Sequence, residues 1–516
     1  MKLYRILSIA AVSAFVMIFA AGCGNDFLTV DNPTAQPIEE YFTTPEHLAE
    51  ALVAAYDPLE WTDWGCGAYN PLPIMSDIMS DQIWPGGSDR NDNHYWHLMA
   101  EYSATPTDCM TALWTDAYSG VKRCNDCLTY IGWVNNLDAT IAKSYEAQCR
   151  VLRCMYYSWI WKFWGNVPYY EENLVDPFVC EQLKADQVYE NIMKDLEGAI
   201  ALGVLPMSYS GSEVGHVTKA VAYMLYAEMA MYQKDASRLP TALTYMKEII
   251  ESGAYSLYSD YHKMFSSEGE WCSESIFEIN YKSDGAYRSW GAPLNVGGTV
   301  LPRLLGPSGW TDGVDGHDNG WGFCTVATAT YRMYADGDAR RDATCWNAAA
   351  HGSYNLRYQD TQFFLEKYVG QTTNAGQIAD GDLNYDKNIR YYRFAETLLN
   401  AAELVIAGYG SGDAEKWLNM VHNRAGLTDQ VAATLENVKQ ERRLEFVGEG
   451  KRYWDLIRWG DAASTLVAGD DENFTTGGDR GKLASWKETA KYLPIPQSEI
   501  DAAAGTAYPL TQNPGY

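Results

Sequence analysis

Oxygen-bearing side chains recur at every second position in the segment 380–386. They belong to Asp380, Asp382, Asn384 and Asp386, an order typical of the first half of a calcium-binding loop. The sixth position of such a loop carries Tyr385 instead of glycine here, and the twelfth carries Tyr391 instead of glutamate. A solvated turn that precedes a helix is therefore the favoured interpretation, and a calcium site remains the alternative. A calcium titration that leaves the melting temperature unchanged would exclude the ion.

Acidic and basic residues alternate with apolar ones between positions 442 and 458. The charged members are Arg442, Glu445, Glu449, Arg452, Asp455 and Arg458. On a helix, a spacing of three places Arg442 with Glu445, Arg452 with Asp455, and Asp455 with Arg458 on shared faces. Half-buried arginines form paired hydrogen bonds with carboxylates. We interpret the cluster as a structural ion-pair network that holds the C-terminal segment to the rest of the fold, because catalysis by two carboxylates would need an open cleft.

Common enzyme signatures are missing from the sequence. It contains no Gly-x-Ser-x-Gly elbow, His-Glu-x-x-His motif, phosphate loop, or Gly-x-Gly-x-x-Gly after a strand. His94-x-x-His97 is half of a metal site with no evident third ligand, and its predicted turn favours an exposed loop of polar and aromatic residues. Cys124 and Cys127 share a helix face without a second Cys or His pair nearby, so we expect core positions. The sequence predicts a non-enzymatic protein without a cofactor.

The composition narrows the class of ligand. The chain has 516 residues, a formal net charge of −28, 18 Trp, 37 Tyr and 14 Phe. Nucleic-acid binders and binders of anionic membranes carry basic faces, so the acidic balance argues against both. The many aromatic residues exclude disorder for most of the chain. An acidic surface rich in Trp and Tyr suits neutral, hydroxylated ligands.

The N-terminus has the order of a secretion signal. Lys2 and Arg5 precede an apolar run over residues 7–21, which ends in Ala20-Ala21-Gly22-Cys23. The run is short for a membrane span and fits a signal peptide over residues 1–22. Small residues before a single Cys resemble a bacterial lipobox, so we expect lipidation at Cys23 and a polar tether over residues 23–40; an ordinary signal peptide is the alternative. No later stretch has 18 uninterrupted apolar residues, which predicts a lipid-anchored protein.

Most of the mature chain has helical periodicity. Predicted helices cover residues 45–59, 146–164, 188–202, 219–233, 241–253, 391–406 and 415–424. Thr218 is the expected N-cap of the fourth helix, which pairs with the fifth through small residues. Such pairs are typical of tetratricopeptide-like stacking. We therefore predict a predominantly all-α fold, with one domain over residues 41–516 and a helical scaffold over about 41–264 and 390–460.

Residues 265–389 interrupt this helical pattern. Glycine and tryptophan are dense there, and no helical period is longer than about ten residues. Residues 275–281 alternate and predict one short strand. A long irregular segment in a compact domain is usually functional or disordered, and the aromatic residues argue against disorder. We expect a loop-rich insert on the helical scaffold, followed by a C-terminal segment over residues 461–516.

Several motifs occur in an order that identifies a family. The chain resembles the SusD/RagB family of surface lipoproteins of the Bacteroidetes through Asp26-Phe27-Leu28, Tyr41-Phe42-Thr43-Thr44, Ser76-Asp77-Ile78, Gly165-Asn166-Val167-Pro168, Leu399-Asn400-Ala401-Ala402-Glu403, Asn423-Arg424-Ala425-Gly426-Leu427, Glu441-Arg442-Arg443-Leu444-Glu445-Phe446, Arg452-Tyr453-Trp454-Asp455-Leu456-Ile457-Arg458-Trp459-Gly460, Tyr492-Leu493-Pro494-Ile495-Pro496 and Asn513-Pro514-Gly515-Tyr516. The resemblance implies a non-catalytic protein on the outer membrane that captures oligo- or polysaccharide for a TonB-dependent transporter. A binder of peptides or another nutrient is the alternative, and a glycoside hydrolase is a further one.

A glycan-binding site would use aromatic rings on irregular loops. Flat rings stack on the C–H faces of sugars, while polar side chains bond to the hydroxyls. The expected ligand-binding residues are Trp84, Asn93, Trp96, Trp290, Trp310 and Trp321. Trp310 and Trp321 are flanked by glycine and lie outside any periodic pattern, so exposure is expected. We assign Trp159, Trp161 and Trp164, which follow helical patterns, to packing.

Overall fold

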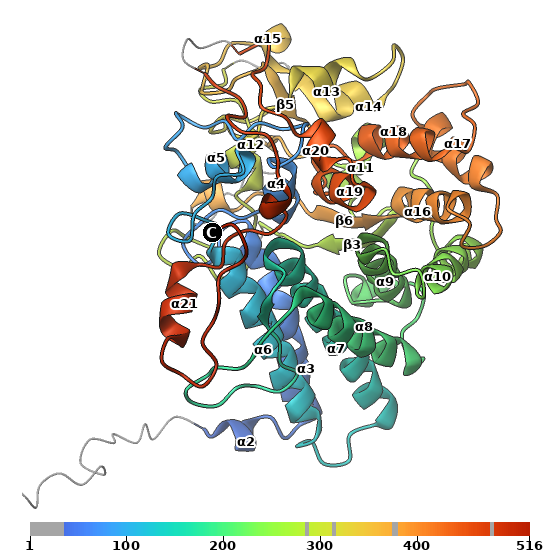
Figure 1. Ribbon diagram of the computed structural model, residues 1–516. Helices are drawn as coiled ribbons and strands as arrows, with labels where there is room; N and C mark the ends of the chain where they lie inside the picture. The colour runs from blue at the N-terminus through green and yellow to red at the C-terminus, as the bar shows by residue number, and fades with distance from the viewer. Residues whose placement is uncertain (1–35, 284–287, 312–315, 374–379, 475–478) are drawn as a thin grey trace, which may run out of the picture.

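A succession of antiparallel helices forms the scaffold of the protein. The computed structural model describes residues 36–283, 288–311, 316–373, 380–474 and 479–516, so the expected signal peptide, Cys23 and most of the tether lie outside the described residues. The principal helices are α3 (Pro45–Tyr56), α6 (Ala112–Ile131), α7 (Ala139–Trp164), α8 (Ala185–Ala201), α9 (Lys219–Gln233), α10 (Leu239–Ser252), α16 (Phe394–Ile406), α17 (Ala414–Arg424), α18 (Leu435–Glu445) and α19 (Arg452–Trp459). Each of α6 to α10 packs against the next, and α10 continues to α16 and α17 (Figure 1).

Local capping explains where these helices begin. The Thr44 side chain accepts a hydrogen bond from the His47 amide at 3.3 Å, and Thr218 accepts one from Val221 at 3.2 Å. Asp138 caps α7 through the amides of Thr140 and Ile141, at 2.8 and 3.1 Å. Each cap satisfies backbone donors that the first turn leaves free. The cap at Asp138 starts α7 seven residues before the predicted position.

The remaining elements are short. The other helices are α2 (Ile38–Tyr41), α4 (Leu72–Asp77), α5 (His94–Ala100), α11 (Tyr261–Met264), α12 (Leu301–Leu305), α13 (Thr328–Arg332), α14 (Arg340–Thr344), α15 (Ala348–His351), α20 (Ala462–Thr465) and α21 (Gln497–Ala503). Three two-stranded antiparallel sheets pair β1 (Val167–Pro168) with β2 (Gln182–Leu183), β3 (Ser275–Ile279) with β6 (Ile389–Arg393), and β4 (Cys345–Asn347) with β5 (Phe363–Leu365). The predominantly helical fold with few short strands is confirmed, and the strand predicted over 275–281 is present over Ser275–Ile279.

The start of α16 differs from the prediction. Residues 391–393 were expected at the beginning of a helix, but they belong to β6 and pair with β3. The helix begins at Phe394, after Arg393 takes an extended backbone with φ −127° and ψ 153°. The prediction of a helix over 391–406 is therefore wrong for its first three residues, because backbone pairing with a strand far away in sequence replaces the local helical tendency.

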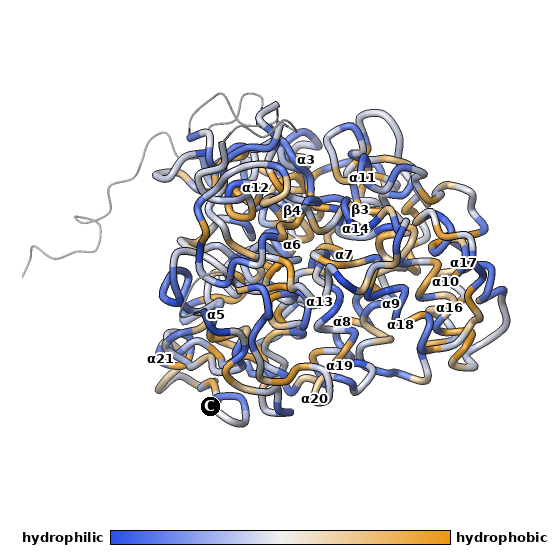
Figure 2. The backbone as a smooth tube through the Cα atoms, turned by 90° about the horizontal axis from the view of Figure 1, so that it is seen from above, coloured by the Kyte–Doolittle hydropathy of each residue, from blue (hydrophilic) through white to orange (hydrophobic). Residues whose placement is uncertain are grey.

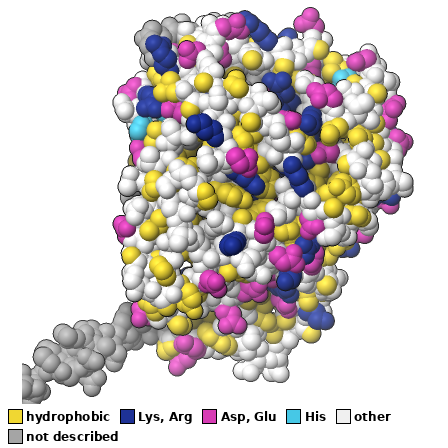
Figure 3. Space-filling model, viewed as in Figure 1, with side chains coloured by type: hydrophobic (Ala, Val, Ile, Leu, Met, Phe, Trp, Pro, Cys, Tyr) yellow, Lys and Arg dark blue, Asp and Glu magenta, His cyan; other side chains and the backbone are white. Residues whose placement is uncertain are grey.

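One hydrophobic core runs through the scaffold. Trp159, Trp161 and Trp164 of α7 are buried in it, as are Cys124 and Cys127 of α6. Apolar and hydrophilic residues alternate along the helices and loops (Figure 2). Basic and acidic side chains are interspersed on the face shown in Figure 3. In the part of the chain that the structure describes, no helix combines the length and hydropathy that crossing a bilayer requires.

Candidate functional site

Four aromatic rings form a closed cluster on loops outside the scaffold. The Trp290 and Trp321 rings lie nearly parallel, with centroids 6.1 Å apart and planes inclined by 24°. Trp64 meets Trp290 edge-on at 5.4 Å, and Tyr69 meets Trp321 edge-on at 6.0 Å. The centroids of the Trp64 and Tyr69 rings are 4.6 Å apart, and this contact completes the cluster. We call these four residues the aromatic cluster; Trp290 is 43% exposed, which leaves ring surface for a ligand.

A buried ion pair joins two of the loops that carry the cluster. Asp63 accepts hydrogen bonds from Arg288 at 2.7 and 3.1 Å, and also from Thr299 Oγ1 and the Val300 amide at 2.7 and 2.8 Å. Arg288 also donates to the carbonyl oxygen of Trp64. Asp63 and Arg288 lie within one and two residues of Trp64 and Trp290. The pair therefore fixes the distance between the two loops.

The segment with alternating oxygen side chains supports the same cluster. The Asp380 carboxylate accepts the Trp290 amide at 3.0 Å, and Asp382 forms an ion pair with Arg303 at 2.8 Å. Asn384 donates to the carbonyl oxygens of Arg288 and Asp380 at 2.9 and 2.8 Å. These side chains thus hold loops together, and no cluster of metal-ligating residues occurs among the described residues.

Charged side chains border the cluster. The Trp321 amide donates to the carbonyl oxygen of Arg303 at 2.8 Å, so the backbone of Trp321 lies beside that of the residue that pairs with Asp382. Burial, with the nearby carboxylates of Asp92 and Asp382, raises the pKa of Tyr69 to about 12. The Tyr69 hydroxyl is therefore neutral at physiological pH. Guanidinium and carboxylate groups beside exposed rings can donate to and accept from ligand hydroxyls.

Two tryptophans expected in the site are buried elsewhere. Trp96 is 0% exposed in the main core, and Trp310 is 7% exposed and packs against Trp346 at 4.8 Å. The expectation that these rings are exposed is wrong. A Cβ atom at Gly352 would lie 2.5 Å from Trp310, so this glycine leaves the space in which the ring is buried. Trp96 still acts on the cluster indirectly, because its indole N–H donates to the Tyr69 carbonyl oxygen at 3.0 Å.

The structure separates the other expected residues. Trp84 is half-buried, bonds to Asp471 at 3.0 Å and meets Phe474 edge-on, so it is not part of the cluster. Asn93 is half-buried with a left-handed φ of 50° and precedes α5. It follows Asp92, one of the carboxylates that act on Tyr69. Of the expected residues, the structure brings together Trp290 and Trp321. Asn93 is related to the cluster only as the sequence neighbour of Asp92.

The His94-x-x-His97 motif is helical rather than part of a turn. It begins α5, where His97 is buried and its Nε2 lies 3.1 Å from the Gly86 carbonyl oxygen. His94 Nδ1 lies 2.6 Å from an Asp108 carboxylate oxygen. The expected exposed loop is therefore wrong at His97. The positive φ of Asn93 ends the preceding turn and allows the helix to start.

Sequence reasoning missed half of the aromatic cluster. Trp64 and Tyr69 were not among the expected ligand-binding residues, although Gly65 follows Trp64 directly. The same signal, a tryptophan beside glycine outside a helical period, marked Trp310 and Trp321. Applied to Trp64, this signal would have found it. For Tyr69 the sequence offers only its place in the same glycine-rich loop.

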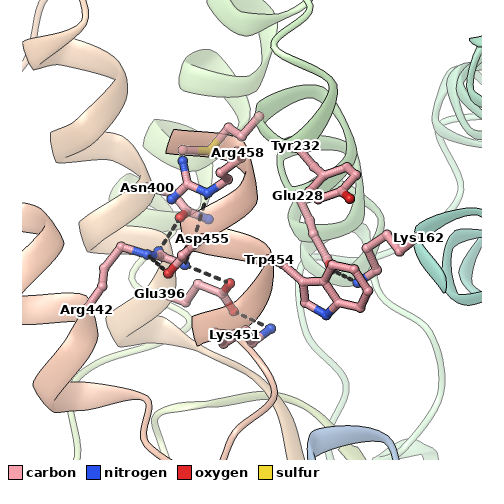
Figure 4. Close-up of a pocket in the computed structure, with 11 residues that line it drawn as sticks. Lys162, Glu228, Tyr232, Glu396, Asn400, Arg442, Lys451, Trp454, Asp455 and Arg458 are labelled. Carbon is pink, nitrogen blue, oxygen red and sulfur yellow. Dashed lines mark hydrogen bonds and ion pairs between the residues drawn. The ribbon is translucent and has the colours of Figure 1, made fainter. Parts of the chain in front are cut away.

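The acidic and basic cluster of the C-terminal half is a buried network (Figure 4). Asp455 accepts from Arg442 and Arg458, each at 2.8 Å, and Lys451 pairs with Glu396 at 3.0 Å. The i, i+3 pair of Asp455 and Arg458 was expected. Arg452 and Glu445 instead bond to partners far away in sequence, Asp81 and Arg393. The cavity among these side chains measures about 30 Å³, room for about two water molecules and none for a sugar ring.

The fold and this surface define the class of the protein. It is a helical scaffold that presents an aromatic cluster on irregular loops, with Trp290 exposed and the other three rings half-buried. Family models match both ends of the chain: one described as "SusD family" covers residues 321–516, and one described as "Starch-binding associating with outer membrane" covers residues 26–231.

Solved structures extend the similarity to nearly the whole chain. Surface glycan-binding protein A from Bacteroides thetaiotaomicron is 53% identical with a TM-score of 0.87; the match covers 92% of this chain and 100% of that one. A second structure of that protein, in complex with laminarihexaose, has a TM-score of 0.86 and covers 91% and 100% of the two chains. A laminarin-binding SusD-like protein is 27% identical with a TM-score of 0.79 and coverage of 92% and 100%. The chain belongs to the SusD family.

Proposed function

We propose that this protein captures a neutral glycan at the cell surface on the aromatic cluster. The exposed Trp290 ring, backed by Trp321 and braced by Trp64, is the observation that supports this most directly. Stacking on such rings contributes on the order of 1 kcal/mol per ring. The affinity for a short oligosaccharide is therefore expected between about micromolar and millimolar.

The glycan we infer is a β-1,3-linked glucan of the laminarin type. The 53%-identical relative was solved with laminarihexaose, and a second relative is described as laminarin-binding. The cluster is bent, since Trp64 and Tyr69 are inclined by 71° and 65° to their tryptophan neighbours. A bent platform suits a chain that curves, as β-1,3 linkages make it, better than a flat β-1,4 ribbon. Carboxylates at Asp92 and Asp382 disfavour anionic glycans at the same place.

We infer further that the protein is a lipid-anchored binder that delivers glycan to a TonB-dependent transporter. The lipobox-like sequence before Cys23 and membership of the SusD family support this proposal. Binding without hydrolysis is also proposed, because Asp380 and Asp382 beside the cluster are engaged with the Trp290 amide and with Arg303.

Calorimetry on soluble protein starting at Gly24 tests the proposal. Laminarin and laminari-oligosaccharides are titrated beside amylose, a cellulose-type oligosaccharide and a polyuronate. We expect binding that Trp290→Ala weakens for the laminarin series alone, without release of reducing sugar. Failure to bind laminarin would contradict the inferred ligand, and tighter polyuronate binding that Trp290→Ala also weakens would contradict the choice of a neutral glycan at the aromatic cluster. Affinity purification from detergent-solubilised membranes tests the partner, and a preparation without a β-barrel transporter would contradict it.

A further inference from the structure

A second cavity lies between α11, short elements of the loop-rich insert and the segment that precedes β6. It measures about 930 Å³, within the range of small-molecule sites in proteins. Helix α11 and helix α14 contact each other at one side (Figure 1), and β4 and α15 continue the wall. The aromatic cluster contributes none of its four residues to this wall. Lys263, Arg341 and Lys387 line the cavity, together with three carboxylates, Glu268, Asp342 and Glu366. We call it the basic cavity, because three histidines add to the basic side chains of its wall.

The buried part of the wall has a fixed geometry. Glu366 accepts from His317 Nε2 at 2.8 Å and lies 3.2 Å from His262 Nε2. The His317 ring stacks on Trp346, with centroids 3.8 Å apart and an interplanar angle of 11°. Glu366, His317 and Trp346 are all buried. His262 and His317 therefore both contact the carboxylate of Glu366, and stacking on Trp346 holds His317 in place.

Lys387 is a buried cation without a direct counter-ion. Its ammonium donates to the Val369 carbonyl oxygen at 3.1 Å, and among the described residues no carboxylate lies within 4.0 Å of it. An ammonium group has three donors. Burial lowers the pKa of Lys387 to about 8, although Glu366 and Glu270 act in the opposite direction. The buried charge is thus only partly compensated, and an anion in the cavity would stabilise it.

The cations at the rim are paired with rim carboxylates. Lys263 lies 3.4 Å from Glu268, and Arg341 lies 3.2 Å from Asp342. The charges of these four side chains cancel in pairs. The pair of Lys263 and Glu268 is exposed to solvent, so Lys263 contributes little to the binding of an anion. Lys387 is consequently the cation of the wall that a ligand can neutralise most effectively.

We propose that the basic cavity binds the carboxylate of an acidic sugar, with Lys387 as its counter-ion. A monoanion fits better than a dianion such as phosphate, because Glu366 faces the same space. Hydroxyls of the sugar would find the polar wall at His262 and Asn347. The acid could be a free monosaccharide or the uronic residue of an oligosaccharide. The inference does not depend on the glycan proposed for the aromatic cluster.

The test uses the soluble chain starting at Gly24 and three probes. Glucuronate, a disaccharide that contains glucuronic acid, and glucose as the neutral probe are titrated by calorimetry up to about 20 mM. We expect glucuronate to bind and glucose not to bind. Tighter binding of the disaccharide would identify an oligosaccharide residue as the source, and equal binding would identify the free acid. No binding of either acid would overturn the proposal.

Variants locate the binding. Lys387→Met should weaken glucuronate binding about tenfold or more, whereas Lys263→Met, which removes a paired rim cation, should stay within about twofold. Glu366→Gln should tighten binding several-fold, because it removes the competing negative charge; this gain cannot arise from misfolding. An unchanged affinity in both Lys387→Met and Glu366→Gln would overturn the proposal. Trp290→Ala should leave glucuronate binding unchanged, which separates this result from the fate of the proposed glycan site.

Discussion

Asp63 and Arg288, 225 residues apart in sequence, form a buried two-pronged ion pair at 2.7 and 3.1 Å. The pair ties the loop of Trp64 to the loop of Trp290, and Asn384 reinforces it through the Arg288 carbonyl oxygen. The arrangement of two rings of the aromatic cluster thus depends on a charge pair that a bound glycan does not need to touch.

Arg288→Met should lower both stability and glycan affinity. It leaves the Asp63 carboxylate buried without a cation, which costs about 3–5 kcal/mol of unfolding free energy. Urea denaturation measures this loss, and calorimetry measures the affinity. If Arg288 acts by positioning Trp290, the variant should weaken binding in the wild-type background but add little in a Trp290→Ala background. Additive effects of the two substitutions would contradict the positioning role.

Trp290→Ala and Trp321→Ala should each weaken laminari-oligosaccharide binding about fivefold, since stacking contributes on the order of 1 kcal/mol per ring. The melting temperature should change little in Trp290→Ala, because that ring is 43% exposed. Trp84→Ala is the matched control, since Trp84 lies outside the cluster and bonds to Asp471. Calorimetry and thermal melts of the same samples decide between the outcomes. An unchanged affinity with lost stability would assign these rings to packing.

Glu445→Gln should be strongly destabilising. Glu445 is buried among Arg393 at 3.0 Å, Arg340 at 3.3 Å and Arg424. Burial alone would raise the pKa of Glu445, but these arginines outweigh it and lower the pKa to about 2. The variant should lose about 3–5 kcal/mol in urea denaturation. The exposed pair of Glu472 and Arg332 supplies the control, because Glu472→Gln should cost less than about 1 kcal/mol.

The same lowered pKa gives stability a defined pH dependence. The contribution of Glu445 is complete above the ordinary pKa of a glutamate, about 4.3. It is lost as the pH falls from there toward about 2, where the folded-state group takes up its proton. The stability of Glu445→Gln should therefore fall less steeply over this range than that of the parent protein, and an identical slope would contradict the assignment.

Lys482 predicts a dependence of the same sign as Glu445, a stability that rises with pH, but at a higher pH. Its ammonium is buried and donates to the Ala100 carbonyl oxygen at 2.9 Å, and burial lowers its pKa to about 7. Above that pH the unfolded chain binds more protons at this residue than the folded one, so the contribution of Lys482 rises with pH. Lys482→Met removes this contribution. Between about pH 7 and 9 its unfolding free energy should rise less than that of the parent, measured in urea at each pH.

Cys23→Ala should release the protein from membranes. A lipid anchor supplies about 0.8 kcal/mol per buried CH₂ group, and after residue 23 no stretch of the sequence has 18 uninterrupted apolar residues. Fractionation of cells that lack the proposed transporter measures the distribution. A variant that still sediments fully with the membranes would show that lipidation is not the anchor.

Local signals allowed most of the scaffold to be predicted. Helix α9 begins and ends where Thr218 and the periodicity place it, because a cap and an apolar stripe lie within one stretch of sequence. Residues 391–393 carry a helical pattern too, but their backbone pairs with Ser275 and its neighbours in β3. That pairing depends on a partner more than a hundred residues away, and periodicity within a window cannot report it.

Local sequence also fails to predict which individual aromatic rings belong to the candidate site. Trp310 and Trp321 each follow a glycine in the sequence and lie outside any helical period. Trp310 is nevertheless buried, since Trp346 and Gly352 provide a pocket for it. Trp321 is half-buried instead, and it meets Tyr69 and Trp290 in the aromatic cluster. What decides the role of each ring is therefore the shape of segments that are distant in sequence.

Trp290 lies in the stretch between residues 231 and 321, which neither family model covers. Trp64 and Tyr69 fall within one model, and Trp321 is the first residue of the other. Recognition of the family therefore rests on the two ends of the chain and does not include Trp290, the most exposed ring of the aromatic cluster. Under the proposed function, substitutions around residue 290 would change the preferred glycan without changing the match to the family. Two proteins that match the family equally well would then bind different polysaccharides.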